Sequence, residues 1–449
     1  MRTFADMEKE WVNIKMPRYG ISTVAVREML QGVSGSCAIV SLDAGGKLPD
    51  DAAERLMAVA FSVPEAGIVY SDLFRTGPDG ISVHVPLADW QKGSLRDDFD
   101  FGGFILLNRQ AIDWYLSQSL GQFQTAGFYQ MWLAVSRKFG IIHIKEPLYN
   151  IAETDSRKSG EKQFDYVNPR NRSVQIEMEA VCTEHLKCVG AFLTPDKFRT
   201  VRFEEEFERE ASVIIPVRNR ARTIEDAVRS ALSQKTDFAF NVIVVDNHST
   251  DGTSTILERL SAEDGRLVHI IPSQTDLGIG GCWDLAIRDS RCGRFAVQLD
   301  SDDLYSSEGT LQYIVDKFHS EKCAMVIGSY RMCDFALNTL PPGTIDHREW
   351  TDDNGPNNAL RINGLGAPRA FYTPVVRKIG FPNVSYGEDY AVAIAISRQY
   401  RIGRIYDELY LCRRWEGNSD AALSPEKVSA NNYFKDSLRT AELLRRCSK

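Results

Sequence analysis

Residues 295–303, with the sequence FAVQLDSDD, decide the fold, because an apolar run ends there in a cluster of acidic side chains. Two earlier stretches have the same form, SVIIPVRNR at residues 212–220 and VIVVDNHSTDGT at residues 242–253. Short continuous runs rich in valine and isoleucine are typical of strands covered on both faces, as in parallel sheets. The polar residues after each run are therefore expected at the carboxyl edge of a sheet, where such sheets bind ligands.

The segments between these runs have the periodicity of helices. Residues 224–233 place small and aliphatic side chains on one helical face, and shorter helices are expected at about residues 253–261 and 282–288. A further strand is expected at residues 267–271. Strands that alternate with helices predict an α/β fold with a mostly parallel sheet flanked by helices.

The bulk properties of the chain are those of an ordinary globular protein. Its 449 residues are 43% hydrophobic and 25% charged, with a formal net charge of −8. The acidic balance argues against nucleic acid as a partner, since nucleic-acid-binding domains are usually basic. No apolar run is long enough for a membrane span, and the first residues lack the apolar core of a signal peptide. Nine cysteines without metal-type spacing favour reduced thiols, so a cytoplasmic protein is expected.

The two halves of the chain resemble each other. Residues 136–149 align with residues 397–410 without a gap. Two shorter matches earlier in each half lie in the same order and at nearly the same offset. The shorter matches pair Leu42-Asp43 with Leu299-Asp300 and Gly20-Ile21 with Gly278-Ile279. We interpret this pattern as an internal duplication.

The two copies differ at their acidic residues. Gly45 and Gly46 of the first copy align with Asp302 and Asp303, and Gly127 and Phe128 align with Glu388 and Asp389. The first copy also begins late, because Val12-Asn13-Ile14 already aligns with Val268-His269-Ile270. The sequence therefore predicts a degenerate, truncated lobe at residues 1–150, a linker with a helix near 173–193 at residues 151–210, and a catalytic domain at residues 211–449.

Residues 211–419 resemble the family 2 glycosyltransferases of the GT-A fold. The resemblance rests on three motifs in the family's order, at residues 213–219, 244–253 and 300–303. It implies a transferase that moves a sugar from a nucleotide-sugar donor to an acceptor hydroxyl with inversion. By the same analogy, the first lobe is expected to be GT-A-like and the pathway to be polysaccharide biosynthesis at the cell surface.

The resemblance also implies where the donor binds. Asp246 matches the family's base-binding carboxylate, and Asp300 is placed near the ribose. The other residues expected at the donor are Pro216, Val217, Arg218, Asn219, Asp276, Gly278, Ser301 and Arg414. Because the family often has asparagine at Asp276, the base stays open: a UDP-sugar is favoured, and GDP- and dTDP-sugars are alternatives.

A divalent metal is expected beside the donor. The diphosphate leaving group is highly charged, and Mn²⁺ or Mg²⁺ neutralises such charge through carboxylate, phosphate and water oxygens. In the resemblance Asp302 is the metal ligand of this DXD motif, with Asp303 beside it. Family members often carry a histidine where this chain has Trp415-Glu416, which makes Glu416 an alternative oxygen ligand.

The stretch Gly387-Glu388-Asp389-Tyr390 resembles the family's Glu-Asp motif at a helix start. There Asp389 is implied to be the general base that takes the proton of the acceptor hydroxyl, with Glu388 beside it. The simpler alternative is that both carboxylates only complement the positive end of a helix.

The acceptor is expected to be a glycan or a lipid-linked saccharide, and the resemblance places the turn at residues 363–368 near it. Residues 433–446 read as an amphipathic helix, which is expected to pack on its own domain. Peripheral contact with the inner face of a membrane is the alternative for this helix, and a homodimer is a further hypothesis.

Two other functions stay open as alternatives. A sugar nucleotidyltransferase would need a glycine-rich loop after its first strand, but residues 217–222 contain no glycine. A non-catalytic glycan-binding or scaffolding protein fits the first copy, which has lost its acidic residues. It does not fit the second copy, which keeps them.

Overall fold

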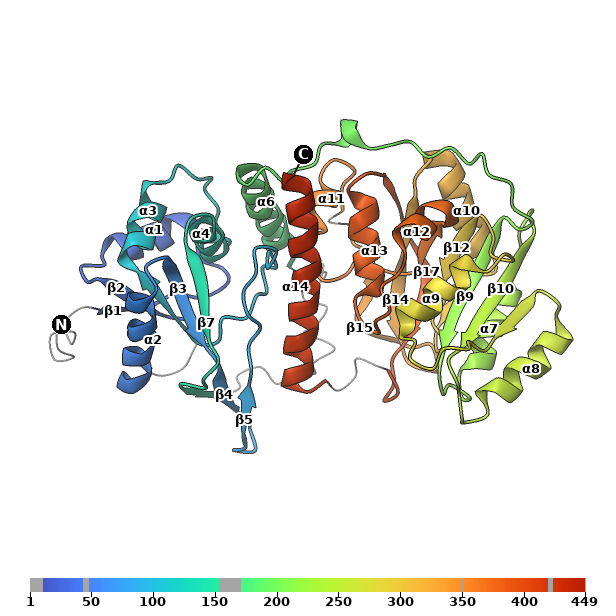
Figure 1. The fold of residues 1–449 in the computed structure, drawn as a ribbon, viewed down its shortest axis with the longest axis horizontal. Helices are drawn as coiled ribbons and strands as arrows, with labels where there is room; N and C mark the ends of the chain where they lie inside the picture. The colour runs from blue at the N-terminus through green and yellow to red at the C-terminus, as the bar shows by residue number, and fades with distance from the viewer. Residues whose placement is uncertain (1–10, 43–47, 153–170, 349, 419–422, 449) are drawn as a thin grey trace.

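The computed structural model describes residues 11–42, 48–152, 171–348, 350–418 and 423–448. An N-terminal lobe and a larger C-terminal lobe lie on either side of one long helix, α14 (Pro425–Cys447) (Figure 1). The aligned residues Asp43, Gly45 and Gly46 lie outside the described ranges. Within the described ranges, no helix combines the length and apolar character needed to cross a bilayer.

The first half of the C-terminal sheet is parallel, as the sequence predicts. Strands β11, β10, β9 and β12 are neighbours in this order, and each pair runs parallel. Their bounds are β9 Ala211–Val217, β10 Phe240–Asp246, β11 Leu267–Ile270 and β12 Phe295–Gln298. Almost every side chain of β9 and β10 is buried, because helices cover both faces of these strands.

The helices expected between these strands are confirmed. They are α7 (Ile224–Leu232), α8 (Thr253–Glu263) and α9 (Ile279–Arg288). Helix α9 begins earlier than expected, directly after Gly278, whose extended backbone serves as the N-cap. A side chain at Gly280 would meet the carbonyl of Pro382, so glycine lets this helix approach the segment before α13 (Glu388–Ser397).

The second half of the same sheet is mixed rather than parallel. Strand β16 (Arg369–Tyr372) runs antiparallel to both β12 and β14 (Met325–Cys333), while β17 (Ile402–Arg413) runs parallel to β14. Two short partners complete it, β13 (Leu304–Tyr305) on β17 and β15 (Thr339–Ile345) on β14. Helices α10 (Thr310–Glu321), α11 (Gly355–Asn358) and α12 (Thr373–Ile379) connect these strands.

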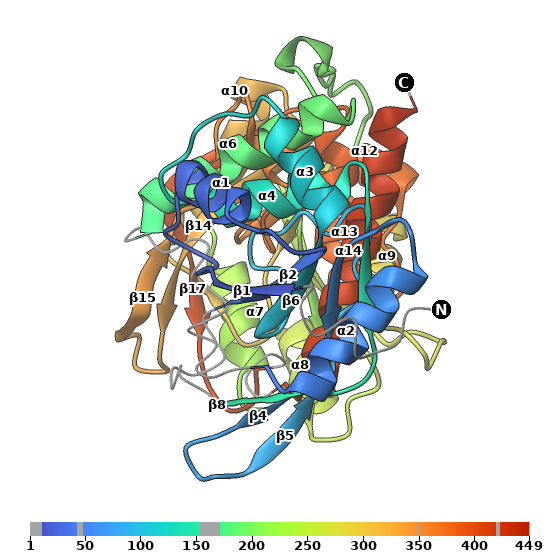
Figure 2. The ribbon, with the colours of Figure 1, turned by 90° about the vertical axis from the view of Figure 1, so that its left-hand side faces the viewer.

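The N-terminal lobe is an α/β unit around a five-stranded sheet, in the order β1-β2-β6-β3-β7. Helices α1, α3 and α4 lie together on one side of this sheet, and α2 lies on the other (Figure 2). The strands are β1 (Trp11–Lys15), β2 (Cys37–Ser41), β3 (Ala66–Ser71), β6 (Phe104–Asn108) and β7 (Gly140–Ile144). The helices are α1 (Thr23–Gln31), α2 (Asp50–Ser62), α3 (Arg109–Ser117) and α4 (Gly127–Ser136). A small sheet of β4 (Leu73–Thr76), β5 (Ser82–Val85) and β8 (Asn150–Ala152) extends from it.

Four strands of each lobe share one arrangement. In β2-β6-β3-β7 the first two pairs are antiparallel and the last pair is parallel. The order β12-β16-β14-β17 has the same three senses of pairing. Helices α4 and α13 precede the last strands and end at Ser136 and Ser397, the two residues that the sequence alignment pairs.

Strand β1 lies where the sequence alignment alone would not put it. The alignment pairs it with β11, at the far edge of the C-terminal sheet, but β1 pairs in parallel with β2, as β9 does with β12. In the described residues nothing equivalent to β9 and β10 precedes it. Strand β1 therefore covers the edge of β2 directly, which pairs backbone groups that would otherwise be open.

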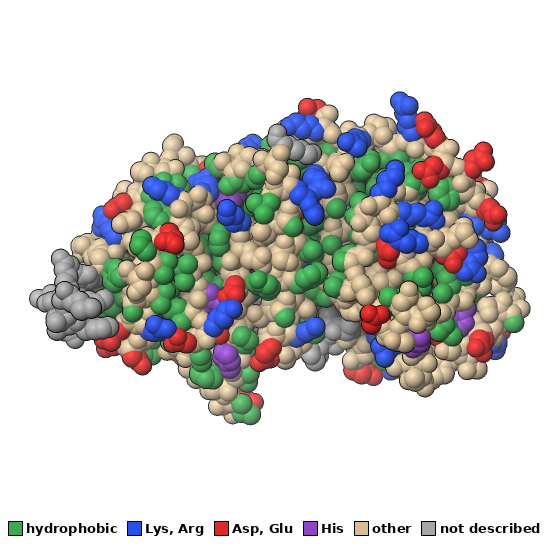
Figure 3. All heavy atoms as spheres, in the orientation of Figure 1, with side chains coloured by type: hydrophobic (Ala, Val, Ile, Leu, Met, Phe, Trp, Pro, Cys, Tyr) green, Lys and Arg blue, Asp and Glu red, His purple; other side chains and the backbone are tan. Residues whose placement is uncertain are grey.

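The two remaining helices differ in extent from the expected ones. Helix α6 (Arg172–Cys188) stops before residue 193, because Gly190 turns the chain with a φ of 75°. Helix α14 begins at Pro425, well before residue 433, because the Ser424 side chain caps it. Its buried face is mostly polar and contacts both lobes, through residues Asn431, Lys435, Asp436, Arg439, Glu442, Leu443 and Arg446. On the face drawn in Figure 3, charges of both signs are intermixed.

Candidate active site

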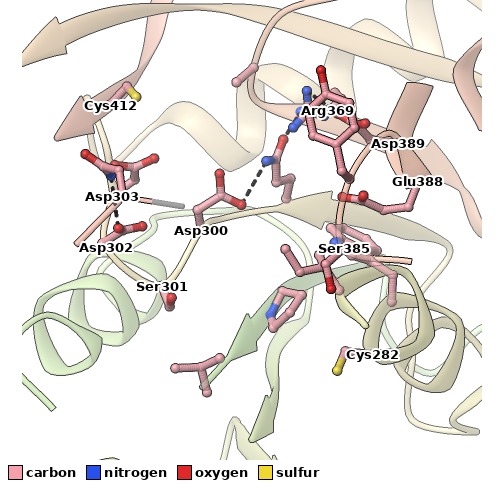
Figure 4. Close-up of a pocket in the computed structure, with 18 of the residues that line it drawn as sticks. Cys282, Asp300, Ser301, Asp302, Asp303, Arg369, Ser385, Glu388, Asp389 and Cys412 are labelled. Carbon is pink, nitrogen blue, oxygen red and sulfur yellow. Dashed lines mark hydrogen bonds and ion pairs between the residues drawn. The ribbon is translucent and has the colours of Figure 1, made fainter. Parts of the chain in front are cut away.

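A cavity of about 540 Å³ opens at the carboxyl edge of the parallel strands in the C-terminal lobe. This volume lies in the range of small-molecule sites. Strands β9 and β12 contribute their last residues to it, and the start of α13 lies opposite. Asp300, Asp302 and Asp303 lie on one side of the cavity, and Arg369, Glu388 and Asp389 lie on the other (Figure 4).

The structure brings together most of the residues that the sequence nominates. Those in the wall of this cavity are Pro216, Val217, Arg218, Asp300, Ser301, Asp302, Asp303, Glu388, Asp389 and Arg414. Five nominated residues lie outside that wall: Asn219, Asp246, Asp276, Gly278 and Glu416. All these predicted site residues are separated by long stretches of chain, so the order of the strands in the sheet determines which of them lie together.

The acidic turn after β12 is held by hydrogen bonds from the end of β12 and from β17. The backbone N–H of Asp300 donates to the Tyr410 hydroxyl at 2.9 Å, and the Gln298 amide donates to the Asp300 carboxylate at 2.9 Å. The Asp303 carboxylate accepts from the backbone N–H of Arg413 at 2.7 Å. Burial, and then the charges of Asp302 and Asp300, raise the pKa of Asp303 well above its usual range. A cation bound at this turn would relieve that repulsion.

Asp302 is positioned by the segment after β17. Its Oδ2 atom accepts a hydrogen bond from the indole N–H of Trp415 at 3.0 Å and another from the Asn418 amide at 3.2 Å. Trp415, which stands where family members often carry a histidine, therefore binds the Asp302 carboxylate directly. Both bonds reach the same oxygen, so the carboxylate keeps a second oxygen for another ligand.

The donor atoms at this turn fit a divalent cation that shares its shell with a substrate. Among the described residues, no group of three or more His, Cys, Asp or Glu side chains is arranged to hold a metal alone. Mg²⁺ and similar hard cations commonly take one or two carboxylates and complete their shell with phosphate and water oxygens. Asp302, with Asp300 and Asp303 close by, offers such a partial set.

Across the cavity, Asp389 and Glu388 are adjacent carboxyls in different environments. The Asp389 carboxylate pairs with the Arg369 guanidinium at 2.7 Å. Burial opposes its charge, but Arg369 and Lys435 outweigh burial and leave its pKa below the usual value. Burial and the charge of Asp389 raise the pKa of Glu388 to about 8, and its Oε2 atom is buried without a hydrogen bond. At neutral pH Asp389 is therefore the ionised carboxylate of the pair.

Arg369 is a site residue that the sequence reasoning missed. It is the first residue of β16 and follows the turn at residues 363–368. Its backbone N–H donates to the side chain of Gln298 at 3.1 Å, which in turn holds Asp300. One short network thus links the acidic turn to Asp389. The feature of the sequence that could have pointed to Arg369 is its position directly after the glycine-rich turn at residues 363–368.

Asp246 lies at the predicted strand end, but it faces its own loop. Its carboxylate is fully buried, accepting from the Ser249 backbone N–H at 3.0 Å and from the Ser254 hydroxyl at 2.5 Å. These bonds tie the end of β10 to the loop that leads into α8 and to its first turn. Contact between Asp246 and a nucleotide base stays a prediction, and Asn247, the next residue, is the one in the cavity wall.

The other residues outside the wall also have local partners. The Asn219 side chain accepts from the backbone N–H of Thr250 at 2.8 Å, and the backbone of Gly278 donates to Asn383 at 2.7 Å. The carbonyl of Asp276 accepts from the same asparagine at 3.2 Å. Glu416 is exposed and pairs with Arg222 at 3.3 Å. A role of Glu416 as a metal ligand stays a prediction.

Comparison with known proteins identifies the class of this domain. Residues 212–373 match the family model described as "Glycosyl transferase family 2", so this part of the chain is a glycosyl transferase family 2 domain. The match contains the acidic turn and Arg369 and ends before Glu388 and Asp389.

Particular relatives agree with this class over a short stretch. The chain is 36% identical to glycosyltransferase AglD of Haloferax volcanii over 129 residues, which is 28% of this chain and 20% of that protein. It is 32% identical to the putative teichuronic acid biosynthesis glycosyltransferase TuaG of Bacillus subtilis over 124 residues, 27% of this chain and 46% of that protein. The chain thus spans less than half the length of these relatives. A solved structure of S. aureus TarS 1–349 with UDP aligns with a TM-score of 0.41 and 21% identity, covering 52% of this chain and 65% of that one.

Proposed function

We propose that this protein is a metal-dependent, inverting glycosyltransferase that uses a nucleotide-sugar donor. The observation that carries the proposal is the cavity in which the acidic turn of the family 2 domain faces an ionised carboxylate, Asp389. The acidic turn suits a diphosphate with its cation, and Asp389 suits an acceptor hydroxyl. A surface polysaccharide or lipid-linked glycan is the proposed acceptor, in line with the name of TuaG.

In the proposed reaction, Asp389 takes the proton of the acceptor hydroxyl as its oxygen forms a bond to the anomeric carbon. The bond from that carbon to the diphosphate oxygen breaks, and the nucleoside diphosphate leaves with the electron pair. Attack from the face opposite the leaving group inverts the anomeric configuration. Arg369 keeps Asp389 ionised before the reaction and can donate hydrogen bonds to the sugar or acceptor.

Asp302 is the proposed ligand of Mn²⁺ or Mg²⁺, with Asp303 supporting it. When bound, such a cation neutralises charge on the departing diphosphate. Trp415 and Asn418 orient the Asp302 carboxylate through its Oδ2 atom. Arg218 and Arg414 are the proposed partners of the phosphate oxygens, which their position in the cavity wall supports.

We also propose that residues 1–150 are a degenerate copy of the catalytic domain. The shared order and direction of four strands supports this interpretation. The start of α4, which corresponds to the start of α13, is filled by the core: Phe128 is 4% exposed and packs edge-on against Phe101 at 6.2 Å. A phenylalanine in that position leaves no space or charge for a general base.

The proposal is tested with the full chain by thermal shift and by nucleotide release. We expect UDP, GDP or dTDP to raise the melting temperature only with Mn²⁺ or Mg²⁺, by an amount that reports affinity. Asp302→Ala should abolish this shift, whereas Asp316→Ala, at an exposed aspartate of α10, should keep it. Asp389→Asn should keep the shift and lower transfer by about 10²–10⁴-fold, the usual contribution of a general base. Near-wild-type transfer by Asp389→Asn would contradict the assignment of the base.

A further inference from the structure

A second, larger cavity lies between the two lobes. Its volume is about 1030 Å³, at the upper end of the range for small-molecule sites. One wall comes from the N-terminal lobe, at Arg75 and residues 85–100, and another comes from α14. The remaining wall belongs to the C-terminal lobe, at residues 363–365 and at the start of α13.

The inter-lobe cavity meets the candidate active site at the general base. Six residues line both cavities: Gly364, Arg369, Ser385, Tyr386, Asp389 and Lys435. A molecule that fills the inter-lobe cavity can therefore present one of its groups to Asp389 while a donor occupies the other side. We propose that the inter-lobe cavity binds the acceptor saccharide and that the N-terminal lobe supplies one wall of this site. The inference rests on the proposed transferase function.

The lining of this cavity suits a chain of sugar hydroxyls. Arg75 and Asp100 form an ion pair at 2.8 Å, and their side chains are 37% and 36% exposed, so a donor and an acceptor stand side by side. Asp98 adds a second half-exposed carboxylate. Tyr386 and Phe434 offer aromatic rings for the C–H faces of a sugar. Because the cationic groups are largely paired with carboxylates, the lining favours a polyol over a strongly charged ligand.

The wall from the N-terminal lobe is held in place by buried charge pairs. Arg361 of the C-terminal lobe pairs with Asp97 at 3.0 Å, and Arg96 pairs with Asp436 of α14 at 3.1 Å. Both arginines are at most 2% exposed. Breaking such pairs leaves an uncompensated buried charge, so separating the lobes has a high cost in free energy. The cavity is therefore preformed, and ligand binding does not have to order it.

The two loops that meet at this cavity have equivalent places in the two lobes. Residues 86–103 lead into β6, and residues 346–368 lead into β16, the strand with the same pairing in the other sheet. They touch directly, since the Asn363 amide donates to Asp98 at 3.0 Å. Through this loop, a lobe without the acidic residues of the second copy forms part of the proposed acceptor site.

The test measures binding of the full-length protein to an array of immobilised oligosaccharides, with two matched pairs of variants. Ala430→Trp fills the inter-lobe cavity from α14, and Ala441→Trp adds the same side chain to an exposed site of α14 outside it. Arg75→Ala removes a wall group of the N-terminal lobe, and Arg55→Ala removes an arginine that pairs with Glu146 outside the cavity. Circular dichroism of each variant checks folding.

We expect Arg75→Ala to weaken glycan binding by about tenfold or more, the size of one lost charged hydrogen bond. Ala430→Trp should weaken it at least as much, because the added ring occupies space that the saccharide needs. Ala441→Trp and Arg55→Ala should bind as the wild type does. No glycan binding by the wild type, or equal binding by all variants, overturns the inference. Thermal shift with nucleoside diphosphate is run in parallel: glycan binding without a nucleotide shift would leave this inference standing and refute the donor site.

Discussion

At the scale of single residues, the pKa values of two neighbouring carboxyls of α13 are shifted in opposite directions. Asp389 faces Arg369 and Lys435 and is ionised, whereas Glu388 is buried beside the charge of Asp389 and has a pKa of about 8. At neutral pH this difference in pKa leaves Asp389, the proposed general base, ionised while Glu388 is mostly protonated. Both residues resemble one family motif, but the sequence did not distinguish their protonation states, because those depend on Arg369 and on burial.

Replacing Glu388 by glutamine should change the rate of sugar transfer little at neutral pH. Glutamine mimics the protonated acid, so we expect transfer to change by less than about threefold, against about 10²-fold or more for Asp389→Asn. The folded pKa of Glu388 exceeds its ordinary value of 4.5, so the wild type loses stability as pH rises from about 4.5 to 8. Denaturation of both proteins across this range should show the free energy of unfolding of Glu388→Gln increasing relative to that of the wild type as pH rises. A difference in free energy of unfolding that does not change with pH would contradict the raised pKa of Glu388.

Removing the guanidinium of Arg369 should move the pH profile of the enzyme. Arg369 favours the charged form of Asp389, so Arg369→Gln raises the pKa of this base and shifts the acid limb of kcat/KM to higher pH. The measurement is a pH–rate profile with saturating metal. Arg377→Gln, a change on α12 outside the cavity, is the control. Equal acid limbs in wild type and Arg369→Gln would refute this role.

At the scale of elements, α14 joins the lobes through a close backbone contact. The added Cβ of an alanine at Gly93 would overlap the backbone of Arg439 and Thr440. The Gly93 N–H also donates to the Thr440 hydroxyl at 2.9 Å. The amphipathic pattern at residues 433–446 predicted this helix. It did not predict a mostly polar buried face, because the partners of that face come from distant segments of both lobes: Ser94 and Arg96 lie more than 300 positions away, and Tyr390 lies 49 positions away.

Gly93→Ala should therefore loosen the docking of α14. We expect a loss of about 1–3 kcal/mol in the free energy of unfolding, the usual cost of overpacking. Gly32→Ala is the matched control, because its added Cβ comes no closer than 3.5 Å to any neighbour, and we expect a change within about 0.5 kcal/mol. Urea denaturation measures both. Equal stability of the two variants would contradict the close approach of Gly93 to α14.

At the scale of the whole molecule, the buried pairs between lobes should make unfolding cooperative. We expect one calorimetric transition for the wild type, since the interface carries Arg361–Asp97 and Arg96–Asp436. Asp97→Ala leaves the Arg361 charge without its carboxylate and should cost about 3–5 kcal/mol, separating the transition into two. Asp113→Ala, an exposed residue of α3, should leave one transition. Two transitions in the wild type would show that the lobes unfold independently.

The sequence by itself determined the local elements and singled out the acidic turn. The runs at residues 212–217, 242–246 and 295–299 became buried parallel strands, because a strand covered on both faces requires continuous apolar residues. Asp300–Asp303 and Asp389 were proposed as site residues because the stretches that contain them resemble motifs of the family 2 glycosyltransferases.

Only the tertiary structure decided which of these residues meet. It brought Arg369 to Asp389 and Trp415 to Asp302, turned Asp246 toward its own loop, and placed β1 against β2. It also brought the loop of the first lobe into the wall of a cavity that Asp389 lines. These outcomes depend on strand order and on contacts between distant segments, and one side chain's surroundings are not encoded in its neighbours along the chain.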